Sequence, residues 1–156
     1  FHMWLPVQGL VSEETYFLES SPYNTVTAPG DSLESITVTA YQYRDNSLYT
    51  EASRGFMPDG SIVPQLAAPG VQIRVPQLNG LYGFSSGTSL GAAQTAGAAA
   101  LLFEWAVVRG NRPFFSGSSV KNYLIRGANR EERLQYPSRD WGFGRLDLYH
   151  TFELLT

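Results

Sequence analysis

Ser89 is the residue whose surroundings most strongly suggest chemistry. It follows Gly87 and Thr88 and opens a long segment rich in alanine and glycine that has helical character. The N-terminus of a helix presents backbone N–H groups without helical partners and the positive end of the helix dipole. A serine hydroxyl there can act as a nucleophile, and the N–H of the same residue can stabilise an oxyanion. Taken alone, a serine at a helix start is more often a cap.

Few residues of the chain could activate this serine. The histidines are His2, in an apolar N-terminal segment, and His150, near the C-terminus. The absence of cysteine excludes disulfides, thiolate–metal sites and cysteine nucleophiles. Two pairs of neighbouring glutamates, Glu13-Glu14 and Glu131-Glu132, offer too few oxygens for calcium. We therefore expect no metal and no cofactor.

The composition fits one globular domain and limits the classes of molecule that the chain could bind. The chain has 156 residues, of which 43% are hydrophobic and 16% charged, with a net charge of -3. A chain with this net charge is not expected to have the basic surface patch that binds nucleic acid. Five arginines are expected on the solvated surface instead. They are Arg109, Arg112, Arg126, Arg130 and Arg133. The first residues show no signal peptide and begin within a β-like segment, so we expect a fragment or a cleavage product.

The elements that must position Ser89 alternate between strands and helices. Apolar or alternating segments predict strands at Phe1 to Val11, Ser35 to Tyr41, Gln65 to Gly70, Val71 to Val75 and Leu81 to Phe84. Helices are expected from Ser89 to about Val108, from an N-cap at Ser116 to Gly127, and from Leu146 to the C-terminus. Between residues 12 and 32 the sequence predicts loops.

The segment from Leu90 to Val108 has nearly the length of a membrane span. Gln94 and Glu104 interrupt it, and alanine and glycine outnumber leucine and isoleucine. We expect a central buried helix, apolar on every face, in a soluble α/β domain rather than a membrane helix.

Two families of serine hydrolase share features with this segment. The run Gly87-Thr88-Ser89-Leu90-Gly91 satisfies the Gly-x-Ser-x-Gly pattern of the α/β-hydrolase nucleophile elbow. Asp140 or Asp147 and then His150 follow in the order of that triad. However, the elbow needs a buried apolar strand directly before it, and Asp147 and His150 lie three residues apart on one predicted helix. This triad remains an alternative.

The longer match resembles the subtilisin-like serine proteases. Gly-Thr-Ser followed by small residues and Ala96-Gly97-Ala98-Ala99-Ala100-Leu101 resembles their nucleophile segment. Three further pieces occur in the family's order. They are Ile36 to Ala40 as a strand, Pro64 to Val71 as the Ala-Pro-Gly segment, and Gly142 to Asp147 as the entry to the last helix.

The resemblance covers roughly Ala28 to Phe152 and implies the fold. That fold is α/β: the C-terminal part of a subtilisin-like three-layer domain, with a mostly parallel sheet and a central buried helix starting at the nucleophile. Ala93-Gln94 and Gln65 depart from the family, which commonly has Pro-His and Asp there. Neither position belongs to the triad.

Three short segments resemble, more specifically, the clostridial germination proteases of the Csp type. They are residues 43–47, 102–105 and 136–142. Those proteases carry a jelly-roll insertion before the nucleophile segment. Residues 1–12 would then be the tail of that insertion, and residues 13–156 the C-terminal part of the peptidase domain. A bacterial spore or a secreted location would fit this relationship.

The resemblance also implies how the site is divided. The family orders its triad as Asp, His, Ser, so a base, an acid and the oxyanion asparagine belong upstream of Ser89. His2 fits a strand residue better than a general base, and no asparagine before Ser89 has the family's Gly-Asn context. This chain would carry the nucleophile half only, with Ser89 and its backbone N–H, and Thr27 lining the substrate pocket.

We therefore expect a serine endopeptidase segment that acts on protein or peptide substrates together with the upstream half of the same protease. The alternative is a pseudo-protease or binding module that keeps the fold. The resemblance further implies a cis bond between Ala28 and Pro29. Without its upstream half, the chain is expected to expose apolar surface and to associate, with Phe1 to Val11 as the segment most ready to exchange.

Overall fold

A parallel pair of strands forms the centre of the computed structural model, which describes residues 3–6 and 9–155. Strands β1 (Val38–Tyr41) and β2 (Leu66–Pro69) pair with Val38 opposite Leu66. Leu66 and the two alanines after it are completely buried. Short apolar strands without polar alternation are typical of parallel sheets that are covered on both faces.

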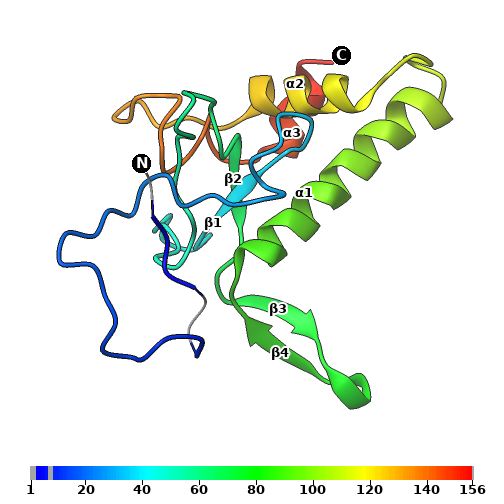
Figure 1. Cartoon of the computed structure of the whole chain (residues 1–156). Helices are drawn as coiled ribbons and strands as arrows, with labels where there is room; N and C mark the ends of the chain where they lie inside the picture. Colours follow the sequence, from blue (N-terminus) through cyan, green and yellow to red (C-terminus); the bar gives the residue numbers. More distant parts are fainter. Residues whose placement is uncertain (1–2, 7–8, 156) are drawn as a thin grey trace.

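The helix that begins beside Ser89 packs across both strands (Figure 1). It comprises α1 (Thr88–Phe103) and a π-helical turn, η2 (Glu104–Val108), and the chain turns away at Gly110, whose φ is 73°. Its buried residues are Gly91, Thr95, Ala98, Leu102 and Ala106. The predicted start, length and end of this helix are therefore close to those observed.

The expectation that this helix is buried on every face is wrong for the described part of the chain. By length and composition, Thr88–Val108 could cross a membrane, but only 28% of its apolar window is buried. One face packs on the sheet, where Gly91 lies against the Thr39 carbonyl and Ala68. The opposite face is exposed, including Leu101 and Val108. Alanine and glycine on all sides favour no particular face, so the close approach at Gly91 determines which one packs.

A β-hairpin connects the parallel pair to α1 and projects from the rest of the molecule (Figure 1). Strands β3 (Ile73–Pro76) and β4 (Tyr82–Ser85) pair antiparallel around a 3₁₀ turn, η1 (Leu78–Gly80). The sheet content is therefore not mostly parallel within the described residues. A parallel connection needs a crossover of a dozen or more residues, and the link between β3 and β4 is too short for one.

Two C-terminal helices pack against each other, and the first of them also packs against α1. Helix α2 (Gly117–Gly127) begins at the predicted cap, Ser116, whose side chain accepts a hydrogen bond from the N–H of Ser119. Helix α3 (Leu148–Glu153) begins two residues later than predicted, because the N–H of Leu146 donates to the carbonyl of Ala67 in β2. The core between these helices and the sheet includes Leu66, Ala98, Leu102, Val120 and Leu124.

The N-terminal segment does not have the predicted β-structure where it is described. Residues 3–6 and 9–11 form no strand, and Phe1 and His2 lie outside the described residues. Pro6 cannot donate to a strand ladder. The apolar pattern of the segment was real, but a strand also needs a neighbouring strand, and the described residues offer none there. The loops predicted between residues 12 and 32 are present.

Candidate active site

Ser89 is the second residue of α1 and is exposed to solvent. The N-cap residue, Gly87, provides no side-chain cap, while its carbonyl accepts a hydrogen bond from the N–H of Leu90. No acceptor in the described part of the chain takes the N–H of Ser89. The first N–H groups of a helix attract negative charge when they are unpaired. Ser89 therefore presents a hydroxyl and a free donor at one place.

The turn before Ser89 is fixed to the ends of the parallel strands. The N–H of Gly87 donates to the Gly70 carbonyl at 2.8 Å, and the N–H of Gly70 donates to the Tyr41 carbonyl at 3.0 Å. A Cβ at Gly70 would lie 2.7 Å from both the Ala40 Cβ and the Gly87 carbonyl oxygen. One turn further along α1, Gln94 Nε2 donates to the Pro69 carbonyl at 3.0 Å. The helix start thus has a defined position relative to β1 and β2.

A groove of about 500 Å³ lies between the start of α1 and the start of β1. Its lining comprises Pro29, Gly30, the residues from Ser35 to Val38, Thr88, Ser89 and Ala92. A smaller hollow of about 150 Å³ adjoins it and is lined in part by Thr27. Thr37, Val38 and Thr88 line both. Ser89 and Thr27 therefore belong to adjacent hollows and lie on either side of shared walls.

The wall opposite Ser89 is built from the segment around Pro29. The Ala28–Pro29 peptide bond is cis, as the resemblance implies. The N–H of Gly30 donates to the Thr27 carbonyl at 2.8 Å, and Thr37 Oγ1 donates to the Gly30 carbonyl at 2.6 Å. Thr37 was not singled out from the sequence. The one feature of the sequence that could have identified Thr37 as a residue of the groove is its hydroxyl near the start of a predicted strand.

Gln65 connects this wall to the centre of the sheet. Its side chain is almost completely buried, with 2% of the residue exposed. Its Oε1 accepts from the N–H of Thr37 at 2.7 Å, and its Nε2 donates to the Ile62 carbonyl at 3.1 Å. The backbone of Gln65 also accepts from the N–H of Phe143. A carboxylate could not donate to the Ile62 carbonyl, so the amide suits this position.

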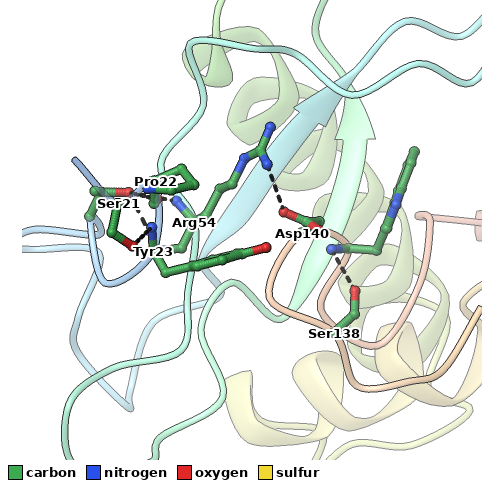
Figure 2. A network of polar contacts seen from close by, with 8 residues as sticks. Ser21, Pro22, Tyr23, Arg54, Ser138 and Asp140 are labelled. Carbon is green, nitrogen blue, oxygen red and sulfur yellow. Dashed lines mark hydrogen bonds and ion pairs between the residues drawn. The ribbon is translucent and has the colours of Figure 1, made fainter. Parts of the chain in front are cut away.

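A second network anchors the loop that carries Thr27 (Figure 2). The N–H of Thr25 donates to the Arg54 carbonyl, and the N–H of Arg54 donates to Thr25 Oγ1. Arg54 also forms an ion pair with Asp140 at 3.3 Å. Asp140 belongs to the loop in which the N–H of Trp141 donates to Ser138 Oγ at 3.0 Å. Polar contacts therefore join three segments that are distant in sequence.

The polar groups that could activate Ser89 in the alternative triad have other roles. Asp147 caps α3 by accepting from the N–H of His150 at 2.9 Å, and His150 Nδ1 lies 3.1 Å from the Gly127 carbonyl. Neither makes a hydrogen bond with Ser89.

The upstream aspartates Asp45 and Asp59 stand in exposed turns, where hydrogen bonds from Ser47 and Ser61 lower the pKa of each carboxyl.

No general base reaches Ser89 within the described residues, and no three histidine, cysteine or acidic side chains there cluster as a metal site. Within the described residues, the arrangement presents a hydroxyl and an N–H donor beside a groove. A serine nucleophile is activated by an adjacent general base.

Comparison with known proteins agrees with the geometry. A family model described as the subtilase family matches residues 18–144. The solved CspB protease of Clostridium perfringens superposes with a TM-score of 0.86 and 40% identity, over 90% of this chain and 31% of that protein. A search of curated protein sequences finds no match.

Two maturation proteases show the same fold at lower identity. The prenylagaramide maturation protease PagA has a TM-score of 0.71 and 24% identity, over 86% of this chain and 47% of that one. The patellamide maturation protease PatA has a TM-score of 0.66 and 23% identity, again over 86% and 47%. The chain therefore spans about a third to a half of the length of these structures.

Proposed function

Because this chain belongs to the subtilase family, we propose that it is the nucleophile-bearing C-terminal part of a subtilisin-like serine endopeptidase, homologous to the Csp germination proteases. Residues 13–156 would form this part of the peptidase domain, and residues 1–12 would be the tail of an inserted jelly-roll module. The substrates would be proteins or peptides.

The observation that supports this function most strongly is the position of Ser89. It is exposed at the start of α1, beside a groove, with an N–H that no described acceptor takes. In the proposed reaction, Ser89 Oγ attacks a peptide carbonyl while a histidine from the upstream half accepts its proton. The N–H of Ser89 donates to the carbonyl oxygen as negative charge develops on it.

Thr27 and the hollow that it lines would receive a substrate side chain. Thr37 and Thr88 separate this hollow from the groove at Ser89. A side chain that enters the hollow would therefore hold the scissile carbonyl close to the nucleophile. Such positioning accounts for a large part of catalysis in enzymes of this kind.

The upstream half would complete the three-layer domain. The outer edge of β1 has no strand partner among the described residues beyond a single bridge from Tyr41 to Leu48. Parallel strands from upstream could extend the sheet at this edge, and further elements could cover the exposed face of α1. The acid, the base and the oxyanion asparagine would come from the same half.

Two alternative functions can be distinguished from the proposed one, each by its own observation. A pseudo-protease would have the same groove but would lack the upstream Asp or His. The α/β-hydrolase triad of Ser89, Asp147 and His150 is not supported, because Asp147 and His150 hydrogen-bond at the ends of α3 and α2.

A complementation assay tests the proposal. The chain is mixed or co-expressed with the upstream half of its parent protease, and hydrolysis of a fluorogenic peptide library is followed. We expect activity only from the combination, and Ser89→Ala should abolish it. Subtilisin itself loses about 10⁶-fold in kcat when its nucleophile is removed. An inactive combination that contains an intact upstream Asp and His would reject the proposal.

A further inference from the structure

The connection from α1 to α2 begins at the C-terminal end of α1 (Figure 1). A second hollow region is lined by residues of this connection and of α2. It consists of two hollows of about 240 and 220 Å³, both lined by Ser119 and Tyr123. Arg112 and Phe114 line the first, and Arg126 lines the second. We call these five residues the Tyr123 surface. The helix between it and Ser89 is roughly 30 Å long, so the two sites are separate.

Two arginines of the Tyr123 surface hold their charges over one aromatic ring. The guanidinium carbons of Arg112 and Arg126 lie 5.8 and 5.9 Å from the centre of the Tyr123 ring. Both side chains are exposed, and neither has an ionic partner among the described residues, whereas Arg109 nearby pairs with Glu104. Because like charges repel at this separation, an anionic group supplied from outside would be favoured here.

The aromatic part of the surface combines a packed ring, that of Tyr123, with an exposed ring, that of Phe114. Phe115 is buried and stacks on Tyr123 with ring centres 5.7 Å apart, and it makes an edge contact with Phe103 at 5.8 Å. Phe114, the next residue in the chain, is 99% exposed. An aromatic ring held in water beside arginines has the composition of a binding hot spot, in which tyrosine and arginine are enriched.

We propose that the Tyr123 surface binds an acidic peptide segment in an extended conformation. Its two carboxylates would pair with Arg112 and Arg126, and an apolar side chain would pack on Phe114. Each hollow is smaller than the roughly 300–1,000 Å³ of a small-molecule pocket, and their side-by-side arrangement suits successive side chains of a peptide.

The spacing of the two arginines agrees with such a peptide. Both guanidinium groups lie within 6 Å of one ring centre, so they are no more than twice that distance apart. Residues i and i+2 of an extended strand point to the same side and lie about 7 Å apart. Two glutamates separated by one residue could therefore reach both arginines at once.

Fluorescence anisotropy with a labelled octapeptide tests this binding. The probe carries two glutamates separated by one residue and a phenylalanine next to the second, and its control carries glutamines in their place. We expect a Kd of about 10–100 μM for the probe, at least about tenfold weaker binding of the control, and weaker binding of the probe at high salt.

Substitutions in the chain locate the site. The double variant R112Q/R126Q should weaken binding about tenfold, and Phe114→Ala several-fold, because each removes a proposed contact. Arg74→Gln is the matched control, since Arg74 lies over Tyr82 at 4.7 Å in the hairpin and should leave binding unchanged. All four side chains are exposed, and circular dichroism verifies the fold.

Three results would overturn the proposal. The first is equal binding of the glutamate and glutamine peptides, and the second is an equal loss in R74Q and in R112Q/R126Q. The third is self-association of the chain that R112Q/R126Q abolishes without any peptide, which would make a second copy the occupant. If the double variant fails to fold, the comparison of the glutamate and glutamine peptides and the effect of Phe114→Ala on binding test the proposal.

Discussion

Gln65 and Thr37 are joined by two hydrogen bonds, one from the Thr37 N–H and one to the Thr37 carbonyl. Gln65 Oε1 accepts from the N–H of Thr37 at 2.7 Å, and the N–H of Gln65 donates to the Thr37 carbonyl at 2.8 Å. Thr37 in turn holds the Gly30 carbonyl and lines both hollows beside Ser89. The buried amide therefore fixes the wall of the proposed substrate groove.

Replacing this amide should destabilise the chain. Gln65→Leu leaves the N–H of Thr37 without its partner in a partly buried place and should lower the free energy of unfolding by about 1–3 kcal/mol. Gln42→Leu is the control, because Gln42 Oε1 is buried without any hydrogen-bond partner and its loss should be nearly neutral. Urea denaturation measures both variants, and equal effects would contradict the role given to Gln65.

Gly70 should tolerate no side chain. Gly70→Ala places a Cβ against Ala40 and the Gly87 carbonyl and should cost about 1–3 kcal/mol while displacing the turn before Ser89. Gly97→Ala is the matched control, since Gly97 is an exposed residue of α1 with no neighbour within 4 Å of its Cβ position. The control should gain about 0.5–1 kcal/mol from helix propensity. Thermal denaturation compares the two, and a neutral Gly70→Ala would refute this packing.

Tyr41 should make the chain less stable in alkali. Burial raises the pKa of its hydroxyl above 10.0, an effect that Arg145 partly opposes. As the pH rises through about 10, the unfolded chain loses this proton before the folded chain does, so the free energy of unfolding falls. Tyr41→Phe removes this contribution, and the exposed Tyr149→Phe serves as control. Urea midpoints at about pH 9 and about pH 11 should differ less in Tyr41→Phe than in the control.

The exposed face of α1 should cause association when the chain is alone. Leu101 and Val108 are 51% and 79% exposed, and apolar patches above roughly 300–600 Å² are uncommon on monomers. Light scattering should show dimers or larger species, and L101K/V108K should reduce their mass. Leu18→Lys, at a loop position that is even more exposed, should not. A monomer that binds no hydrophobic dye at high concentration would disprove the prediction.

Local signals in the sequence predicted the elements around Ser89 well. The Ser116 cap, the glycine after the first helix and the strands near residues 38 and 66 are encoded within a few residues of where they act. The predicted strand at Ser35 begins three residues late in the structure, because a side chain, that of Gln65, takes the N–H of Thr37. No local pattern contains that contact, since the two residues are 28 positions apart.

Features that depend on distant partners could not be predicted. An apolar N-terminal segment fits a strand only when another strand lies beside it, and an alanine-rich helix does not reveal which face packs. The five arginines expected on the solvated surface are exposed, as predicted, but the sequence did not indicate the contacts that three of them make. Arg112 and Arg126 lie over Tyr123, and Arg130 donates to the Ile125 carbonyl at the end of α2.

The most direct test of the central claim is labelling with a fluorophosphonate probe, followed by mass spectrometry of the modified peptide. We expect the probe on Ser89 when the upstream half is present, no labelling of the isolated chain, and none in Ser89→Ala. Robust labelling of Ser89 in the isolated chain would show that a base within these 156 residues activates it. Labelling at another residue of the combined halves would show that Ser89 is not the nucleophile.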